Sequence, residues 1–149
     1  MEFAIVSPLL IILVFGLITF GVIFAQKLAV TNGARQGGRL GVVNSHTCQD
    51  ILNEVVSSGG TILMNPSAAP GNTKLSVDVE IAGSPVCPVT TAATGYSGAT
   101  ATKQPCQNQP TNTEITVYAR WDGTLFIPLL FSNRPLQVIG KGVFRCEFS

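Results

Sequence analysis

Four cysteines and one histidine are the side chains in this sequence best suited to covalent or metal chemistry. The cysteines, Cys48, Cys87, Cys106 and Cys146, include no CxxC pair, and His46 is the single histidine. Zinc sites need closely spaced cysteine or histidine ligands, and this spacing is absent. We therefore expect no metal site and no cofactor, and we interpret the four cysteines as two disulfides.

The four cysteines allow three pairings, and the composition between them favours one. Cys87 and Cys106 lie near the ends of residues 84–112, a stretch rich in Pro, Thr, Gln, Asn, Gly and Ala. Such a stretch cannot pack a core of its own, so a bond between its ends would fix it. We predict Cys87–Cys106, which leaves Cys48–Cys146. Two disulfides indicate an oxidising compartment outside the cytoplasm.

Acidic side chains offer no catalytic set. Asp78 and Glu80 lie on one face of a predicted strand, and we interpret them as part of a solvated face. The sequence has no GxSxG, no HExxH and no glycine-rich phosphate loop after a strand. Only 11% of its residues are charged, the formal net charge is +1, and no basic cluster would track phosphates. We predict no catalytic residues and no nucleic-acid partner.

An apolar segment from residue 3 to residue 25 contains no Asp, Glu, Lys, Arg or His. As a helix rising ~1.5 Å per residue, it is long enough to cross a hydrocarbon layer of ~30 Å. It could be a cleavable signal peptide, a membrane anchor, or a helix buried in an assembly. A signal peptide is disfavoured because the segment follows Met1-Glu2 rather than a basic region, is long, and continues into Lys27 without a turn.

The charges beside this segment conflict with the cysteines about orientation. Lys27, Arg35 and Arg39 follow it and only Glu2 precedes it, so the positive-inside rule would place the remainder in the cytoplasm. The disulfides indicate the opposite side. The flanking charges and the disulfides are both consistent with a mature or truncated form whose basic leader, the orientation signal, has been removed.

Small residues recur at every fourth position in this region, which we call the small-residue stripe: Gly21, Ala25, Ala29, Gly33, Gly37 and Gly41. On a helix, residues four apart share one side, and small residues let another backbone approach closely. We predict a continuous or kinked helix to about Val43, packed against a partner because glycines weaken an isolated helix. Alternatively, Asn32-Gly33 and Gly37-Gly38 are loop residues and the helix ends near Thr31.

A short second helix is predicted over about 48–58. Thr47 fits an N-cap with Asp50 three residues later, and apolar residues from Ile51 to Val56 share one side. The helix ends at Gly59-Gly60, before a linker rich in Pro, Gly and Asn.

Alternating apolar and polar residues predict strands at 75–81, at 115–121 and at about 136–148. Asp122-Gly123 is typical of a turn, and Pro128 argues against a regular central strand at 125–131. The fold class is therefore α+β: a long N-terminal hydrophobic helix and a small head, with a short helix on an antiparallel sheet of three or four strands.

The N-terminal sequence Glu2-Phe3-Ala4-Ile5-Val6-Ser7-Pro8-Leu9-Leu10, followed by Phe15-Gly16 and Thr19-Phe20-Gly21, resembles the start of TadE-like proteins. These are pilins and pseudopilins of tight-adherence (Tad) pilus systems, within the type IV filament superfamily. Residues 34–39 resemble the small-plus-Arg stretch after the family's helix, and residues 142–147 resemble its closing strand.

The resemblance implies a type IV pilin-like structural subunit, not an enzyme. Such a subunit is first inserted in the inner membrane and then joins an extracellular filament on the cell surface. Its partners would be copies of itself in a helical homopolymer, the prepilin peptidase and the pilus assembly machinery. The alternative is a minor pseudopilin, or a single-pass membrane-anchored extracytoplasmic binding domain that does not form the filament shaft.

The predicted subunit-assembly residues are Glu2, Phe3, Pro8 and the small-residue stripe. In the resembled family, the residue corresponding to Glu2 pairs with the N-terminal amine of a neighbouring subunit; alternatively, Glu2 is solvated and favours the helix dipole. Pro8 removes a helix hydrogen bond to the Ala4 carbonyl, for which we expect a slight kink. Residues 1–46 would form the assembly helix and residues 47–149 the disulfide-tied extracytoplasmic head.

Overall fold

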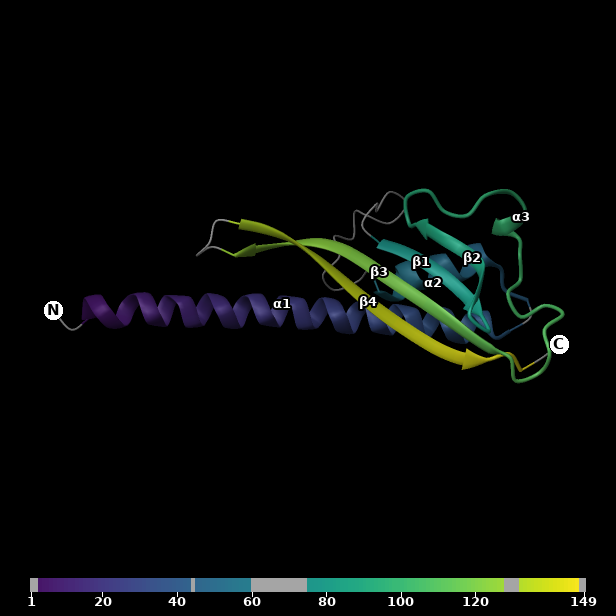
Figure 1. Ribbon diagram of the computed structural model, residues 1–149, viewed down its shortest axis with the longest axis horizontal. Coiled ribbons are helices and arrows are strands. Elements are labelled where there is room, and N and C mark those ends of the chain that lie inside the picture. The colour runs from purple at the N-terminus through teal and green to yellow at the C-terminus, as the bar shows by residue number, and fades with distance from the viewer. Residues whose placement is uncertain (1–2, 44, 60–74, 128–131, 148–149) are drawn as a thin grey trace.

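The computed structural model describes residues 3–43, 45–59, 75–127 and 132–147, and it has the predicted α+β fold (Figure 1). A long N-terminal helix packs along one side of a small head at its C-terminal end, and its N-terminal part projects far beyond the head. In chain order the elements are α1 (Phe3–Gly41), α2 (Cys48–Gly59), β1 (Leu75–Ile81), β2 (Ser84–Thr91), α3 (Gly98–Ala101), β3 (Glu114–Ile127) and β4 (Ser132–Arg145).

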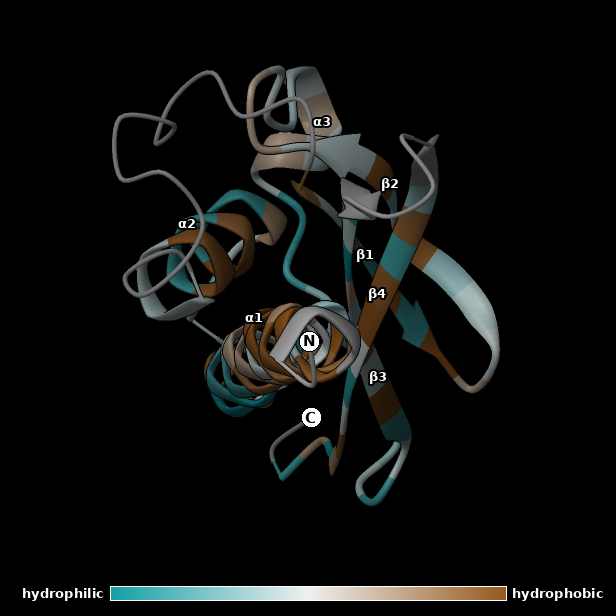
Figure 2. Cartoon of the chain, turned by 90° about the vertical axis from the view of Figure 1, so that its left-hand side faces the viewer, coloured by the Kyte–Doolittle hydropathy of each residue, from teal (hydrophilic) through white to brown (hydrophobic). Residues whose placement is uncertain are grey.

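The four strands form one antiparallel sheet in the order β2-β1-β3-β4. Both α1 and α2 lie against the same face of this sheet, as Figure 2 shows along the axis of α1. The buried core lies between these layers. Its largest members include Ile51 and Leu52 of α2, Leu75 of β1 and Ile115 of β3.

Strand β2 lies within residues 84–112, where the sequence pattern predicted no strand, so the prediction was wrong for residues 84–91. β2 is an edge strand in which only Cys87 is fully buried. Since no row of its side chains faces the core, its sequence lacks the alternating pattern of a half-buried strand. Pro85 and Pro88 also lie in it. Edge strands tolerate proline because one side of their backbone has no strand partner.

Asp122-Gly123 does not form the predicted turn. These residues lie inside β3, opposite Gln137 and Leu136 of β4. The Gln137 amide nitrogen donates to Asp122 Oδ1 at 2.9 Å. The Trp121 side chain lies against Gly123, where a Cβ would come within 2.0 Å of the ring, so the glycine serves packing rather than a turn. Pro128 and the linker at 60–74 are outside the described residues.

Helix α1 continues to Gly41, which confirms the prediction of a continuous helix. The glycines in its second half lie where the head packs most closely. A Cβ on Gly33 would be 2.8 Å from the Val55 carbonyl oxygen, and one on Gly37 would be 2.4 Å from Val55 Cγ2. Packing against α2 therefore offsets the intrinsic weakness of glycine in a helix.

Strand β4 lies against α1 with two glycines at the contact. A Cβ on Gly140 would lie 2.5 Å from the Val30 carbonyl oxygen, and a Cβ on Gly142 would lie 2.4 Å from the Ala34 carbonyl oxygen. Any larger residue at these positions would separate the sheet from the helix. The second half of α1 is thus part of the core of the head.

The N-terminus of α2 is capped as predicted. The Thr47 backbone N–H donates to Asp50 Oδ2 at 2.9 Å, and the Asp50 N–H donates to Thr47 Oγ1 at 3.3 Å. These bonds satisfy backbone donors that a helix N-terminus leaves unpaired. The bonds that the Thr47 N–H and hydroxyl donate to Asp50 Oδ2 also hold the pKa of the Asp50 carboxyl below its usual value of 3.8.

We expect Asp50→Ala to lower the free energy of unfolding by about 1 kcal/mol at neutral pH, because the cap is lost. A carboxyl whose pKa is lowered by folding stabilises the protein above its unfolded-state pKa. That stabilisation is lost as the pH falls through the folded-state value. Urea unfolding at neutral and acidic pH measures the effect, with Asn53→Ala on the same helix as the control. A difference between wild type and Asp50→Ala that persists in acid would contradict this account.

The disulfides are Cys48–Cys87 and Cys106–Cys146, so the predicted pairs Cys87–Cys106 and Cys48–Cys146 were wrong. The cause is the missed strand. Because β2 pairs with β1, it carries Cys87 into the core, where it bonds to Cys48 at the start of α2. The chain then returns past β4, where the Asn112 N–H donates to the Cys146 carbonyl, and Cys106 meets Cys146 there.

Candidate functional site

The first half of α1 is an exposed apolar surface. Large side chains from Val6 to Leu28 are exposed, and Leu9, Leu17 and Phe20 are each more than 60% exposed. Within the described residues, α1 is the one helix long and apolar enough to cross a membrane. An apolar surface of this size requires lipid or protein to cover it.

The small-residue stripe divides between two environments. Ala29, Gly33, Gly37 and Gly41 are buried in the head of the same chain, so their predicted role in contacts between subunits was wrong. The Gly41 Cα faces Ile51 and Ile115, whose Cδ1 atoms would lie about 3 Å from an added Cβ. The stripe does mark a close backbone approach, but the partner is the head itself.

The remaining predicted assembly residues lie at or beyond the exposed half of α1. An added Cβ on Gly21 would meet no atom within 4 Å, and Ala25 is half-buried. Pro8 is inside α1, which continues on both sides of it. Phe3 begins α1, and Glu2 is outside the described residues. A role for these five residues in assembly stays a prediction.

A polar cluster that the sequence did not predict lies on the sheet face away from α1. Asp78 is only 4% exposed, and its carboxylate accepts hydrogen bonds from both terminal nitrogens of Arg120. The Arg120 guanidinium and the Lys141 ammonium each lie over the Tyr118 ring, 5.4 and 5.5 Å from its centre. The interpretation of Asp78 as solvated was therefore wrong, whereas Glu80 is half-buried.

The electrostatics of this cluster fit a structural role. Burial raises the pKa of the Asp78 carboxyl, and the Arg120 charge offsets part of that effect. Burial, with a smaller effect of Asp78, also raises the pKa of Tyr96, whose hydroxyl donates to the Val77 carbonyl at 3.1 Å. That carbonyl belongs to β1 where its pairing with β2 shifts register. The tyrosine thus satisfies a backbone group at an irregular position in the sheet.

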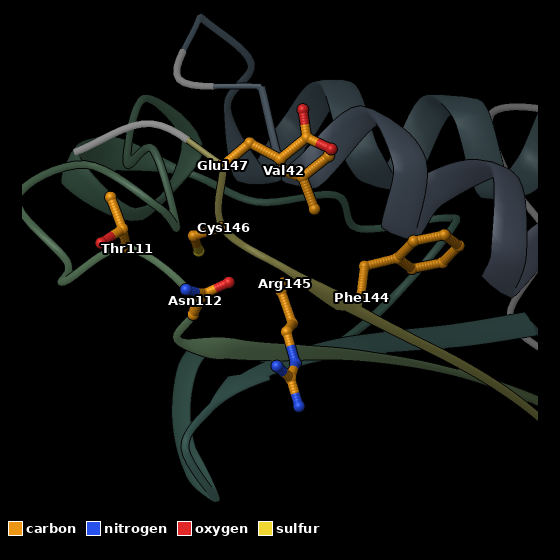
Figure 3. Close-up of a pocket in the computed structure, with 7 residues that line it drawn as sticks. All are labelled: Val42, Thr111, Asn112, Phe144, Arg145, Cys146 and Glu147. Atoms are coloured by element: carbon orange, nitrogen blue, oxygen red, sulfur yellow. The ribbon is translucent and has the colours of Figure 1, made fainter.

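A surface hollow of about 390 Å³ lies near the C-terminal end of β4 (Figure 3), lined by Val42, Thr111, Asn112, Phe144, Arg145, Cys146 and Glu147. The Arg145 and Glu147 side chains point in opposite directions, so the charged groups do not converge on one point. Cys146 is held in a disulfide and is not a free nucleophile. The described residues also contain no group of three or more His, Cys, Asp or Glu side chains that could hold a metal ion.

The fold and its exposed surface define a class of protein: a small disulfide-bonded α+β head on a helix long and apolar enough to anchor it in a membrane. The family model described as TadE-like protein matches residues 1–39, which confirms the resemblance for that segment. No curated protein and no solved structure matches the chain. Residues 1–39 are thus similar to TadE-like proteins, and they include most of the apolar helix that is long enough to anchor the head in a membrane.

Proposed function

We propose that this chain is a structural subunit of an extracellular Tad-type pilus and that it polymerises through α1. The observation that supports this most is the contrast between the halves of α1. The second half packs one side against its own head, whereas the first half exposes large apolar side chains from Val6 onward. Outside a bilayer, such a surface avoids water by packing against equivalent helices.

In this proposal residues 1–46 act as the assembly helix, and residues 47–149 form the displayed extracytoplasmic head. The chain is first anchored in the inner membrane, is processed by a prepilin peptidase, and then leaves the lipid to join copies of itself on the cell surface. Glu2 recruits the N-terminal amine of a neighbouring copy. Buried disulfides support a final location outside the cytoplasm.

Purified surface filaments test this proposal. From cells carrying the complete assembly system, we expect filaments in which this chain is the dominant protein and residues 3–25 are protected from protease without detergent. Glu2→Gln should abolish filaments while the membrane pool of subunit remains. Filaments dominated by another protein, with this chain in trace amounts, would instead support a minor pseudopilin. Soluble monomers with the helix intact would contradict both.

A further inference from the structure

Three cations lie along one side of the part of α1 that packs on the head. Arg35 and Arg39 are about one turn apart and Lys27 lies about two turns before Arg35, so the three lie within about a third of the helix circumference, and we call them the α1 cationic row. All three are exposed. Lys27 Nζ donates to the Ile139 carbonyl of β4, which places this side of the helix beside the sheet edge. Among the described residues, none of the three forms an ion pair.

The α1 cationic row points away from α2. Gly33 and Gly37 are among the α1 positions that contact α2, and Arg35 and Arg39 each follow one of them by two residues. Two residues correspond to a rotation of about 200° around a helix, which is nearly the opposite side. The row therefore forms one flank of the helical layer, and α2 forms the other.

The outer side of α2 is acidic. Its inner side is formed by Cys48, Ile51, Leu52, Val55 and Gly59, which are buried. Asp50 and Glu54 lie one turn apart on the outer side, and α2 contains no Lys or Arg. The Asp50 side chain is 46% exposed, and its bonds to Thr47 lower the pKa of its carboxyl. We call Asp50 and Glu54 the α2 acidic pair.

We propose that the α1 cationic row of one copy docks against the α2 acidic pair of the next copy in the filament. This inference rests on the proposed function and adds a second contact to the one made by the apolar half of α1. The two surfaces lie on opposite flanks of one head, so they cannot meet within a chain. Contact between two different surfaces is head-to-tail, and such contacts extend into open helical filaments when the rotation does not close a ring. The opposite charges select this register among possible neighbours.

Charge reversal tests the proposal in the full-length chain, expressed with its assembly system. We expect Arg35→Glu with Arg39→Glu to reduce filament yield at least about tenfold, because like charges would then face each other. Adding Asn53→Lys and Glu54→Lys, which place two cations on the outer side of α2, should restore most of the yield. Asn53 is exposed, and neither change touches the Thr47–Asp50 cap. Lys141→Glu, at an exposed cation on the sheet face away from α1, is the charge-reversal control and should leave the yield unchanged.

The outcomes separate this inference from the proposed function. If the wild-type chain forms no filament, the proposed function fails. If filaments form equally with Arg35→Glu and Arg39→Glu, the docking inference is overturned and the proposed function stands. If the row contacts anionic lipid instead of a neighbouring copy, the α2 changes restore no filament yield after the double reversal, which also overturns the inference. Unchanged thermal unfolding of each variant shows that the head remains folded.

Discussion

Gly142→Val should destabilise the head by about 3 kcal/mol, although valine is intrinsically the better strand residue. The Cβ of any residue at this position would lie 2.4 Å from the Ala34 carbonyl oxygen and 3.1 Å from the Arg35 Cα. Both atoms belong to the α1 backbone, which cannot rotate out of the way as a side chain can. The sheet must therefore move away from the helix, and the buried contacts between β4 and α1 are lost.

Urea unfolding of the full-length chain in detergent measures this effect. Gly21→Ala is the control, because an added Cβ there meets no atom within 4 Å. Alanine favours the helix more than glycine does, so the control should leave the head as stable as wild type. A stable, cooperatively folded Gly142→Val protein would show that the close approach of β4 to α1 is wrong.

Removing either disulfide should lower the free energy of unfolding by about 4 kcal/mol. The cysteines of the two bonds are separated by 39 and 40 residues, so each bond closes a long loop in the unfolded chain. The paired changes are Cys48→Ala with Cys87→Ala, and Cys106→Ala with Cys146→Ala. All four side chains are buried. Alanine is apolar, so the substitution leaves no unpaired polar group in the core.

Denaturation of each double variant, compared with wild type under non-reducing conditions, measures the effect. Each variant retains the other disulfide, which serves as the internal control for oxidation. Non-reducing peptide mapping of wild type should recover a peptide that joins Cys48 to Cys87. A peptide that joins Cys87 to Cys106 would contradict the placement of β2 in the sheet.

The features that could be predicted from the sequence are those set by neighbouring residues. The Thr47–Asp50 cap involves two residues three positions apart, and α2 begins at Cys48 as that signal indicates. The apolar segment and the four-residue spacing of small residues likewise predicted a helix that continues to Gly41. In each case the physical cause lies within a few residues of its effect.

The features that were missed depend on distant partners. Arg120 is 42 residues from Asp78, so nothing near Asp78 indicates that the carboxylate is buried and paired. Strand β2 is at the sheet edge, contains two prolines, and has no alternating pattern to identify it. The small-residue stripe predicts the close approach of another backbone but carries no information on which backbone that is. For Ala29 to Gly41 the approaching segments belong to the head of the same chain.

The contact between α1 and β4 also determines how tension would pass through the molecule. Gly140 lies against Val30 and Thr31, and Gly142 lies against Ala34 and Arg35, so the strand and the helix run in the same direction. A pull on the N-terminal half of α1 therefore acts along this contact, as shear, rather than peeling the elements apart. In shear the contacts share the load and must break together. No loop separates the pulled segment from the core, because α1 is one continuous helix into the head. The head is therefore rigidly connected to its helix, and α1 has no hinge between its exposed half and the head.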